Sequence, residues 1–161
     1  AEQIRRLLVE GEPGRWSPET ELLLFTAARR DHVERAVRPA LARGAVVVCD
    51  RYVDSTRAYQ GAGAPERRVM VDRLHALAIG LDPDLTLILD MDPATGLERA
   101  KSRGGDEERF EDFGLDMQRR IRAGFLDIAQ EFPDRCRVID GNRPAEDVSA
   151  EIRALVTRAL A

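Results

Sequence analysis

Three short apolar runs, each ending in an aspartate, constrain the fold of this chain most. The runs are residues 45–50 (AVVVCD), 85–90 (LTLILD) and 137–140 (RVID). Continuous apolar runs of this length are typical of strands that are buried on both faces of a parallel sheet. Helical patterns surround them at residues 2–9, 18–43, 65–79, 93–103, 115–132 and 145–160. The alternation predicts an α/β fold, an open parallel sheet with helices on both faces.

The length and the cysteines bound the organisation of the chain. At 161 residues, without a repeat or a Pro/Gly-rich linker, residues 1–161 fit one domain. The chain begins at Ala1, without methionine and directly in a helical pattern, so we expect a domain that is incomplete at its N-terminus. No apolar run approaches the roughly 18 residues of a membrane span. Cys49 and Cys136 form no disulfide framework, which favours a reduced, cytoplasmic protein.

The charge pattern restricts the partners. The 25 basic and 29 acidic side chains give a net charge of −4, which argues against nucleic acid as a ligand and leaves small anionic substrates open. Lys101 is the single lysine, so mechanisms that need several lysines are excluded. The many arginines are explained equally by a GC-rich genome or by recognition of phosphate and carboxylate groups.

The strand ends are the first candidate site. In open parallel sheets, ligands bind at the carboxyl ends of the strands. Asp50, Asp90 and Asp140 stand at three such ends. They therefore mark a possible site, although each aspartate can equally end its strand and cap the next helix.

The segment after the first run carries the densest set of polar groups. Arg51 can bind a phosphate with two hydrogen bonds, and Asp50 can hold a metal ion or accept a proton. The loop that we expect next, residues 55–60, carries hydroxyl, aromatic and amide groups that can contact a polar ring. A surface turn with a solvated arginine explains the same residues.

Two further segments suit a nucleotide. Phe25 and Arg29 are four residues apart and share a helix face, which suits a planar base, although a core phenylalanine beside a surface arginine is the simpler explanation. Residues 99–111 run from a helix through glycines into a charged stretch. Arginines on a closing lid neutralise charge on a transferred phosphoryl group, but such a stretch is often only a solvated loop.

Together these segments resemble the bacterial thymidylate kinases, which belong to the P-loop nucleoside-monophosphate kinases. The matching motifs are Leu24-Phe25-x-Ala27-Ala28-Arg29, Asp50-Arg51-Tyr52 with Ser55-Thr56-x-Ala58-Tyr59-Gln60-Gly61, Pro83-Asp84-Leu85-Thr86-Leu87-x-Leu89-Asp90 and Arg109-Phe110-Glu111. The resemblance covers essentially the whole chain. It implies transfer of the γ-phosphoryl group of ATP, with Mg²⁺, to dTMP, giving dTDP for dTTP synthesis. It also implies a homodimer built on helices such as residues 18–43 and 65–79.

The resemblance assigns roles residue by residue. For dTMP they are Phe25 (stacking on thymine), Arg29 (bonding the base), Arg51 (phosphate), Ser55 and Thr56 (base pocket), and Tyr59 and Gln60 (sugar). The catalytic group comprises Asp50, which also sits beside Mg²⁺, Arg51, Arg103 and Arg109. The ATP side comprises Arg99, Arg103, Asn142 and Arg143, and the lid spans about residues 101–116.

One departure from the family keeps alternatives open. The phosphate-binding motif G-x-x-x-x-G-K-[ST] is absent, and Lys101 follows Ala100, so it cannot be the lysine of that motif. The resemblance implies that this unit precedes Ala1. A non-catalytic nucleotide-binding fragment is therefore one alternative. A second is a haloacid-dehalogenase-type phosphatase, because Asp90-Met91-Asp92 resembles its nucleophile motif, although no lysine follows Lys101.

Overall fold

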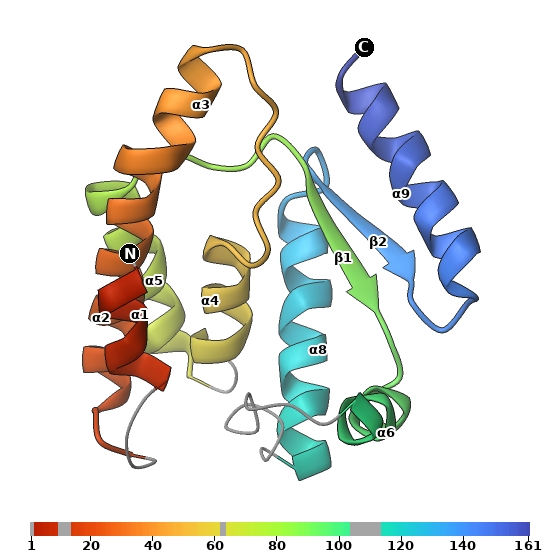
Figure 1. The fold of residues 1–161 in the computed structure, drawn as a ribbon. Helices are drawn as coiled ribbons and strands as arrows, with labels where there is room; N and C mark the ends of the chain where they lie inside the picture. Colours follow the sequence, from red (N-terminus) through yellow and green to blue (C-terminus); the bar gives the residue numbers. More distant parts are fainter. Residues whose placement is uncertain (1, 10–13, 62–63, 104–113) are drawn as a thin grey trace. The chain divides into compact units, whose positions relative to one another are not determined.

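The computed structural model describes residues 2–9, 14–61, 64–103 and 114–161. The chain forms two compact units, Ala1–Asp82 and Pro83–Ala161. The first unit is helical among its described residues, with α1 (Glu2–Val9), α2 (Pro18–His32), a π-helical turn (Val33–Val37), α3 (Arg38–Ala42), α4 (Val53–Gly61) and α5 (Pro65–Ala78) (Figure 1). Within it, α2 packs against α1, α4 and α5, and α4 packs against α5.

A proline explains why the helix expected over residues 18–43 is not regular. Pro39 has no N–H, and its ring crowds the carbonyl four residues earlier. The chain widens into a π-helical turn just before this proline, where the N–H of Arg38 donates to the carbonyl of Val33. Upstream, Ser17 caps α2 by accepting a hydrogen bond from the N–H of Thr20, as the Ser17-Pro18 pair favours. The helical path therefore continues from α2 to α3 through one wide turn.

The strand predicted at residues 45–50 is wrong for the described structure. Residues 45–49 are irregular, and no strand among the described residues pairs with them. Val48 is 93% exposed and Val46 61% exposed. A buried strand needs neighbouring strands that satisfy its N–H and C=O groups and cover its side chains. The apolar pattern alone therefore does not make this segment a strand.

The core of the first unit lies where its helices meet. One cluster joins three buried residues, Leu22, Val53 and Val71, with Tyr52, Met70 and Leu74 packed against them. A second joins Val33, Val37 and Ile79, with Tyr52 again in contact. Tyr52 thus packs against both clusters and fixes the start of α4.

The second unit contains the sheet. Its elements are β1 (Thr86–Asp90), α6 (Pro93–Arg103), α8 (Gly114–Glu131), β2 (Cys136–Asp140) and α9 (Ala145–Ala159). The two strands are parallel, in register from Thr86 opposite Cys136 to Asp90 opposite Asp140. Helix α8 packs against both strands and α9 against β2 (Figure 1). The α/β class, with a parallel sheet flanked by helices, is confirmed. No helix among the described residues has the length and apolar character that crossing a membrane requires.

Candidate functional site

Arg29 on α2 is held against the start of α4. Its Nη2 donates hydrogen bonds to the hydroxyl of Thr56 and to the carbonyl of Tyr52, the latter at 3.4 Å. Its guanidinium carbon lies 5.4 Å from the centre of the Tyr52 ring. Burial lowers the pKa of Arg29, but an arginine stays charged at neutral pH. The result is a fixed, half-buried guanidinium.

Helix α4 carries four of the predicted site residues. Ser55, Thr56, Tyr59 and Gln60 lie on this helix, so the polar loop expected after residue 52 is wrong. The helix forms because Val53 and Ala58 are fully buried and hold one face of it against the unit. Thr56 is buried and the other three are half-buried. Phe25, four residues before Arg29 on α2, is half-buried as well.

Arg51 has an unusual backbone just before α4. Its φ is 61°, in the left-handed region, which costs a residue other than glycine roughly 1–2 kcal/mol. Its guanidinium carbon lies 5.1 Å from the centre of the Tyr59 ring. Both Arg51 and its neighbour Asp50 are exposed. Backbone strain of this kind clusters at functional sites, because the surrounding structure must hold it.

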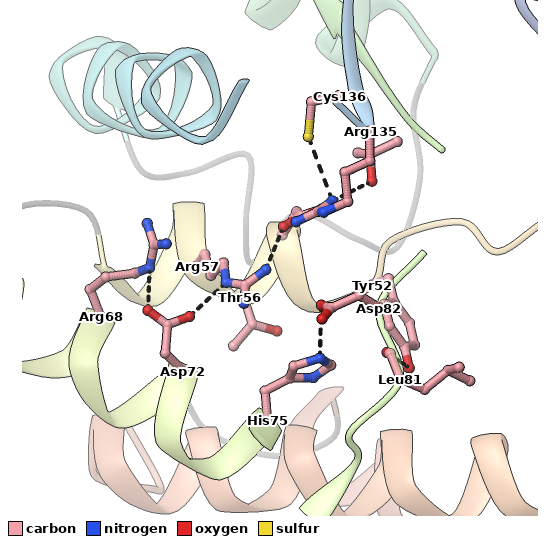
Figure 2. Close-up of polar contacts among 12 residues, drawn as sticks. Tyr52, Thr56, Arg57, Arg68, Asp72, His75, Leu81, Asp82, Arg135 and Cys136 are labelled. Atoms are coloured by element: carbon pink, nitrogen blue, oxygen red, sulfur yellow. Dashed lines mark hydrogen bonds and ion pairs between the residues drawn. The ribbon is translucent and has the colours of Figure 1, made fainter. Parts of the chain in front are cut away.

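An ion-pair network joins α4 to α5. Arg57 donates to Asp54 at 2.8 Å and to Asp72 at 2.7 Å, and Arg68 donates to Asp72 at 2.9 Å (Figure 2). Burial lowers the pKa of Arg57, but the hydrogen bonds to Asp72 and Asp54 outweigh it, so the pKa is raised. This network was not predicted from the sequence. Its signals were the i,i+3 spacing of Asp54 and Arg57 and the i,i+4 spacing of Arg68 and Asp72.

His75 on α5 approaches the same region. Its Nε2 lies 3.0 Å from Oδ1 of Asp82, and its ring stands edge-to-face with the Tyr52 ring at 6.1 Å (Figure 2). The hydroxyl of Tyr52 donates to the carbonyl of Leu81 at 3.0 Å. Burial lowers the pKa of His75. Neither His75 nor Asp82 was predicted from the sequence, since nothing in the local pattern distinguishes them from other helix and loop residues.

In the second unit, the aspartates at the strand ends are already engaged. Asp90 and Asp140 lie opposite each other, as the parallel register requires. Arg122 on α8 donates two hydrogen bonds to Asp90, at 2.6 and 2.7 Å. Asp92 accepts hydrogen bonds from the backbone N–H groups of Ala94 and Thr95, which lower its pKa and cap α6. A phosphatase nucleophile needs a carboxylate that is open to substrate, so this geometry does not favour the phosphatase alternative.

The loop after β2 brings two of the predicted ATP-side residues together. Arg99 on α6 donates to the carbonyl of Gly141 at 3.2 Å, and the side-chain oxygen of Asn142 accepts from the N–H of Asp92 at 3.2 Å. Gly141 donates to the carbonyl of Asp90 at 2.7 Å, and a Cβ at Gly141 would lie 3.0 Å from that oxygen. The close approach therefore favours glycine, because a side chain here would push the carbonyl of Asp90 away.

The remaining predicted residues are less informative. Arg143 forms an ion pair with Glu151 on α9, which raises the pKa of the arginine. Arg109 and the side chain of Arg103 lie outside the described residues, as does most of the lid expected at residues 101–116. Across the described ranges, no group of three or more acidic, histidine or cysteine side chains gathers in a metal-binding arrangement. Asp50 is thus a single exposed carboxylate.

The comparisons with known proteins agree with one another. The family model described as Thymidylate kinase matches residues 1–152. The chain is 63% identical to the thymidylate kinase of Ruegeria pomeroyi, covering 97% of this chain and 74% of that protein. It is 60% identical to that of Dinoroseobacter shibae, covering 98% and 76%. The crystal structure of thymidylate kinase from Ehrlichia chaffeensis matches with a TM-score of 0.72 and 32% identity, covering 96% and 72%. The chain thus spans about three quarters of the length of these relatives.

Proposed function

The chain belongs to the thymidylate kinase family, which phosphorylates dTMP to dTDP, and we propose that the Arg29 network of the first unit is its dTMP site. The observation that carries the proposal is the fixed guanidinium of Arg29, half-buried between α2 and α4 and bonded to Thr56. A hydrogen-bond donor that is held in place and partly shielded from water suits a neutral, polar ring such as thymine. The residues expected to bind the base, phosphate and sugar all belong to this unit.

The free donors of Arg29 suit the oxygen atoms of thymine. Both hydrogen bonds that Arg29 makes to described residues use Nη2 as the donor. Toward the described residues, Nε and Nη1 make none, so they are available to a ring carbonyl oxygen. The hydroxyl of Thr56 can orient the polar edge of the same ring, and Phe25, on the face of α2 that carries Arg29, suits stacking. Ser55 completes the proposed base pocket.

Arg51 is the proposed ligand of the dTMP phosphate. Its guanidinium is exposed, stands over the Tyr59 ring and has the fork geometry that binds phosphate oxygens in pairs. Tyr59 and Gln60, one turn or more along α4 from Ser55, are the proposed wall at the sugar, where they would favour deoxyribose. The phosphate, base and sugar of dTMP would then be bound by residues on α4, just before α4 and on the neighbouring α2.

Asp50 fits a magnesium ion. Mg²⁺ prefers oxygen ligands and is usually held by one or two carboxylates together with substrate phosphates. A single exposed carboxylate beside Arg51 meets that requirement, and a cluster of acidic residues is not needed. When bound, the ion neutralises charge on the phosphates during transfer. The chain's own part is to keep the acceptor phosphate beside Asp50.

The proposed reaction is an in-line displacement with ATP as donor. An oxygen of the dTMP phosphate attacks the γ-phosphorus of ATP, and the bond from that phosphorus to the bridging oxygen breaks to release ADP. Such a transfer needs positioning and charge neutralisation more than covalent chemistry. We assign the positioning to Arg51, the lid charges to Arg103 and Arg109, and the adenine side to Arg99, Asn142 and Arg143.

We also propose a cytoplasmic homodimer. The face of α5 is apolar but open: Leu77 is 86% exposed, Val69 is exposed, and both line a surface hollow with Met70 and Leu74. An exposed apolar face on a charged chain suits a second copy of the same surface.

Leu77→Glu should convert the dimer to a monomer in sedimentation equilibrium. A monomeric parent protein would contradict the assignment.

The Arg51→Ala variant of the full-length enzyme tests the dTMP site. Losing a charge-assisted, two-bond contact should lower kcat/KM for dTMP by about 100-fold, since such bonds contribute about 1.5–3 kcal/mol. Arg119→Ala is the matched control, because Arg119 is an exposed arginine on α8. Equal kcat/KM in the two variants would refute the assignment of Arg51. Full dTMP binding without turnover in the parent would instead support the non-catalytic alternative.

Two further variants test the base and the sugar. Arg29→Gln should weaken binding of thymidine, which has no phosphate, by about 10-fold or more because a bond to a charged donor is lost. Tyr59→Ala should relax the preference for deoxyribose, whereas Tyr59→Phe should retain it, since the proposed role is steric. Unchanged thymidine affinity in Arg29→Gln would contradict the base pocket.

A further inference from the structure

We propose that His75 is a positioning residue for the base pocket, acting through Tyr52 on Arg29, and that the pocket binds thymine only while His75 is neutral. The inference rests on the dTMP site proposed above, because it assigns a consequence to the contacts behind that site. His75 touches no proposed ligand atom. Its effect would pass along a chain of contacts, from His75 to Tyr52, from Tyr52 to Arg29, and from Arg29 to Thr56.

Tyr52 is held at three places. Its hydroxyl donates to the carbonyl of Leu81, its ring meets the His75 ring edge-to-face at an interplanar angle of 89°, and the ring lies under the guanidinium of Arg29. Its own backbone carbonyl accepts from Nη2 of Arg29. A shift of Tyr52 would therefore move both the ring and the carbonyl that hold Arg29. The position of the guanidinium depends on what fixes Tyr52.

His75 and Tyr52 close a ring of contacts behind the pocket. Tyr52 binds Leu81, and His75 binds the next residue, Asp82, through Nε2 at 3.0 Å (Figure 2). The two side chains thus bind adjacent residues of the same loop and also contact each other. Removing the imidazole would remove the hydrogen bond to Asp82 and the edge-to-face contact with the Tyr52 ring. Four residues from three parts of the unit hold one another in place.

The hydrogen bond to Asp82 defines the state of the imidazole. A carboxylate can only accept, so Nε2 carries the hydrogen in the neutral ring and Nδ1 is left as an acceptor. His75 is 4% exposed, and its Nδ1 is buried without a hydrogen-bond partner among the described residues. A proton on Nδ1 would create a buried donor that has no hydrogen-bond acceptor in the described part of the chain, which is costly. The contacts around the ring therefore fit the neutral form.

The charges that face His75 act in both directions. Burial is the largest influence and lowers the pKa of His75; Asp82 raises it, while Arg57 on α4 and Arg29 on α2 lower it. The pKa of His75 therefore lies below that of an ordinary histidine, so the ring is neutral at physiological pH and protonates at a lower pH. The new positive charge would then face Arg29 and Arg57. The ring would have to move, and Tyr52 and the pocket with it.

Thymidine binding to the full-length protein tests the inference. Thymidine has no phosphate, so the titration of dTMP itself, near pH 6 for a phosphate monoester, does not enter. Calorimetric Kd values would be measured from about pH 8 down to about pH 4, so that the series extends below the range in which histidines usually titrate. The parent should lose affinity at the acid end. His75→Gln, whose amide can still donate to Asp82 but cannot be protonated, should show a flat profile.

At the alkaline end, His75→Gln should bind thymidine about fivefold more weakly, because the aromatic contact with Tyr52 is lost. The KM for dTMP should rise by a similar factor while kcat at saturating dTMP changes less than about twofold. His32→Gln is the matched control, since it changes the other histidine of the chain and should keep the parental profile. A purely structural role for His75 would leave Kd and its pH dependence unchanged in a folded variant.

A second variant covers the case in which His75→Gln does not fold. Asp82 is mostly exposed, so Asp82→Asn should fold, and removing its charge should shift the acidic loss of affinity to lower pH. The same pH profile in the parent and in Asp82→Asn would overturn the inference. Normal thymidine binding with no pH dependence would do so while leaving the proposed dTMP site intact. Absence of any thymidine or dTMP binding would overturn the proposed site, and the inference with it.

Discussion

Replacing Arg57 by methionine should be among the most destabilising single changes in the first unit. Asp54 is 4% exposed and Arg57 7% exposed, and their atoms are 2.8 Å apart. Arg57→Met would leave the Asp54 carboxylate buried without the guanidinium that it now contacts. Breaking a buried pair in this way costs about 3–5 kcal/mol, because a buried charge loses its close ion partner. Asp72 is partly exposed and keeps its ion pair with Arg68 in the variant. Loss of the Arg57–Asp72 contact should therefore add less than about 1 kcal/mol to the destabilisation.

A matched pair on α8 isolates the effect of burial. Asp116 and Arg119 have the same residue types and the same i,i+3 spacing as Asp54 and Arg57, at 3.1 Å, but both are exposed. Arg119→Met should therefore lower the free energy of unfolding by less than about 1 kcal/mol. Adding Asp54→Asn to Arg57→Met should recover part of the loss, because no buried charge then remains.

The assay is urea unfolding of the full-length protein, followed by circular dichroism, with the midpoint and the slope compared among the variants. Arg57→Met should be several times more destabilising than Arg119→Met. Similar losses for the two variants would show that burial of the pair does not matter. Strictly additive losses for Arg57→Met and Asp54→Asn would refute the direct coupling between the two side chains.

Three further predictions concern other parts of the chain. Arg51→Gly should be more stable than Arg51→Ala by about 1 kcal/mol in thermal unfolding, because only glycine relieves the left-handed backbone. Gly141→Ala should destabilise the protein by about 1–3 kcal/mol in urea, because its Cβ would crowd the carbonyl of Asp90. A thiol reagent should label only exposed Cys49 in the native protein, with Cys136 reacting after unfolding. That labelling should speed up at a higher pH than for an ordinary thiol, since partial burial raises the pKa of Cys49.

Local sequence patterns predicted much of the second unit. The apolar runs that end at Asp90 and Asp140 became parallel strands, and the parallel register put the two carboxylates opposite each other. Capping residues before Pro18 and Pro93 marked helix starts correctly. These features depend on residues that are close in sequence, such as a cap and its first turn. They could therefore be predicted without any knowledge of the tertiary contacts.

Local patterns gave the wrong prediction where the structure of a segment depends on distant partners. Residues 45–49 have the composition of a strand, but no described strand provides the hydrogen bonds that would make them one. Residues 55–60 were expected to form a polar loop, yet packing of Val53 and Ala58 makes them part of a helix. In both cases the outcome was decided by what lies beside the segment. Periodicity over so few residues cannot supply that information.

The sequence by itself determined the α/β class, the family resemblance and candidate residues such as Arg29, Arg51 and Thr56. It could do so because motifs and apolar periods are local. Only the tertiary structure showed that Arg29 bonds Thr56 across 27 positions and that His75 and Asp82 stand behind Tyr52. Hydrogen bonding, burial and charge depend on distances in space. The packing of the helices therefore decides the supporting contacts of a site. The sequence does not show which of these side chains will meet, because the helices are far apart along the chain.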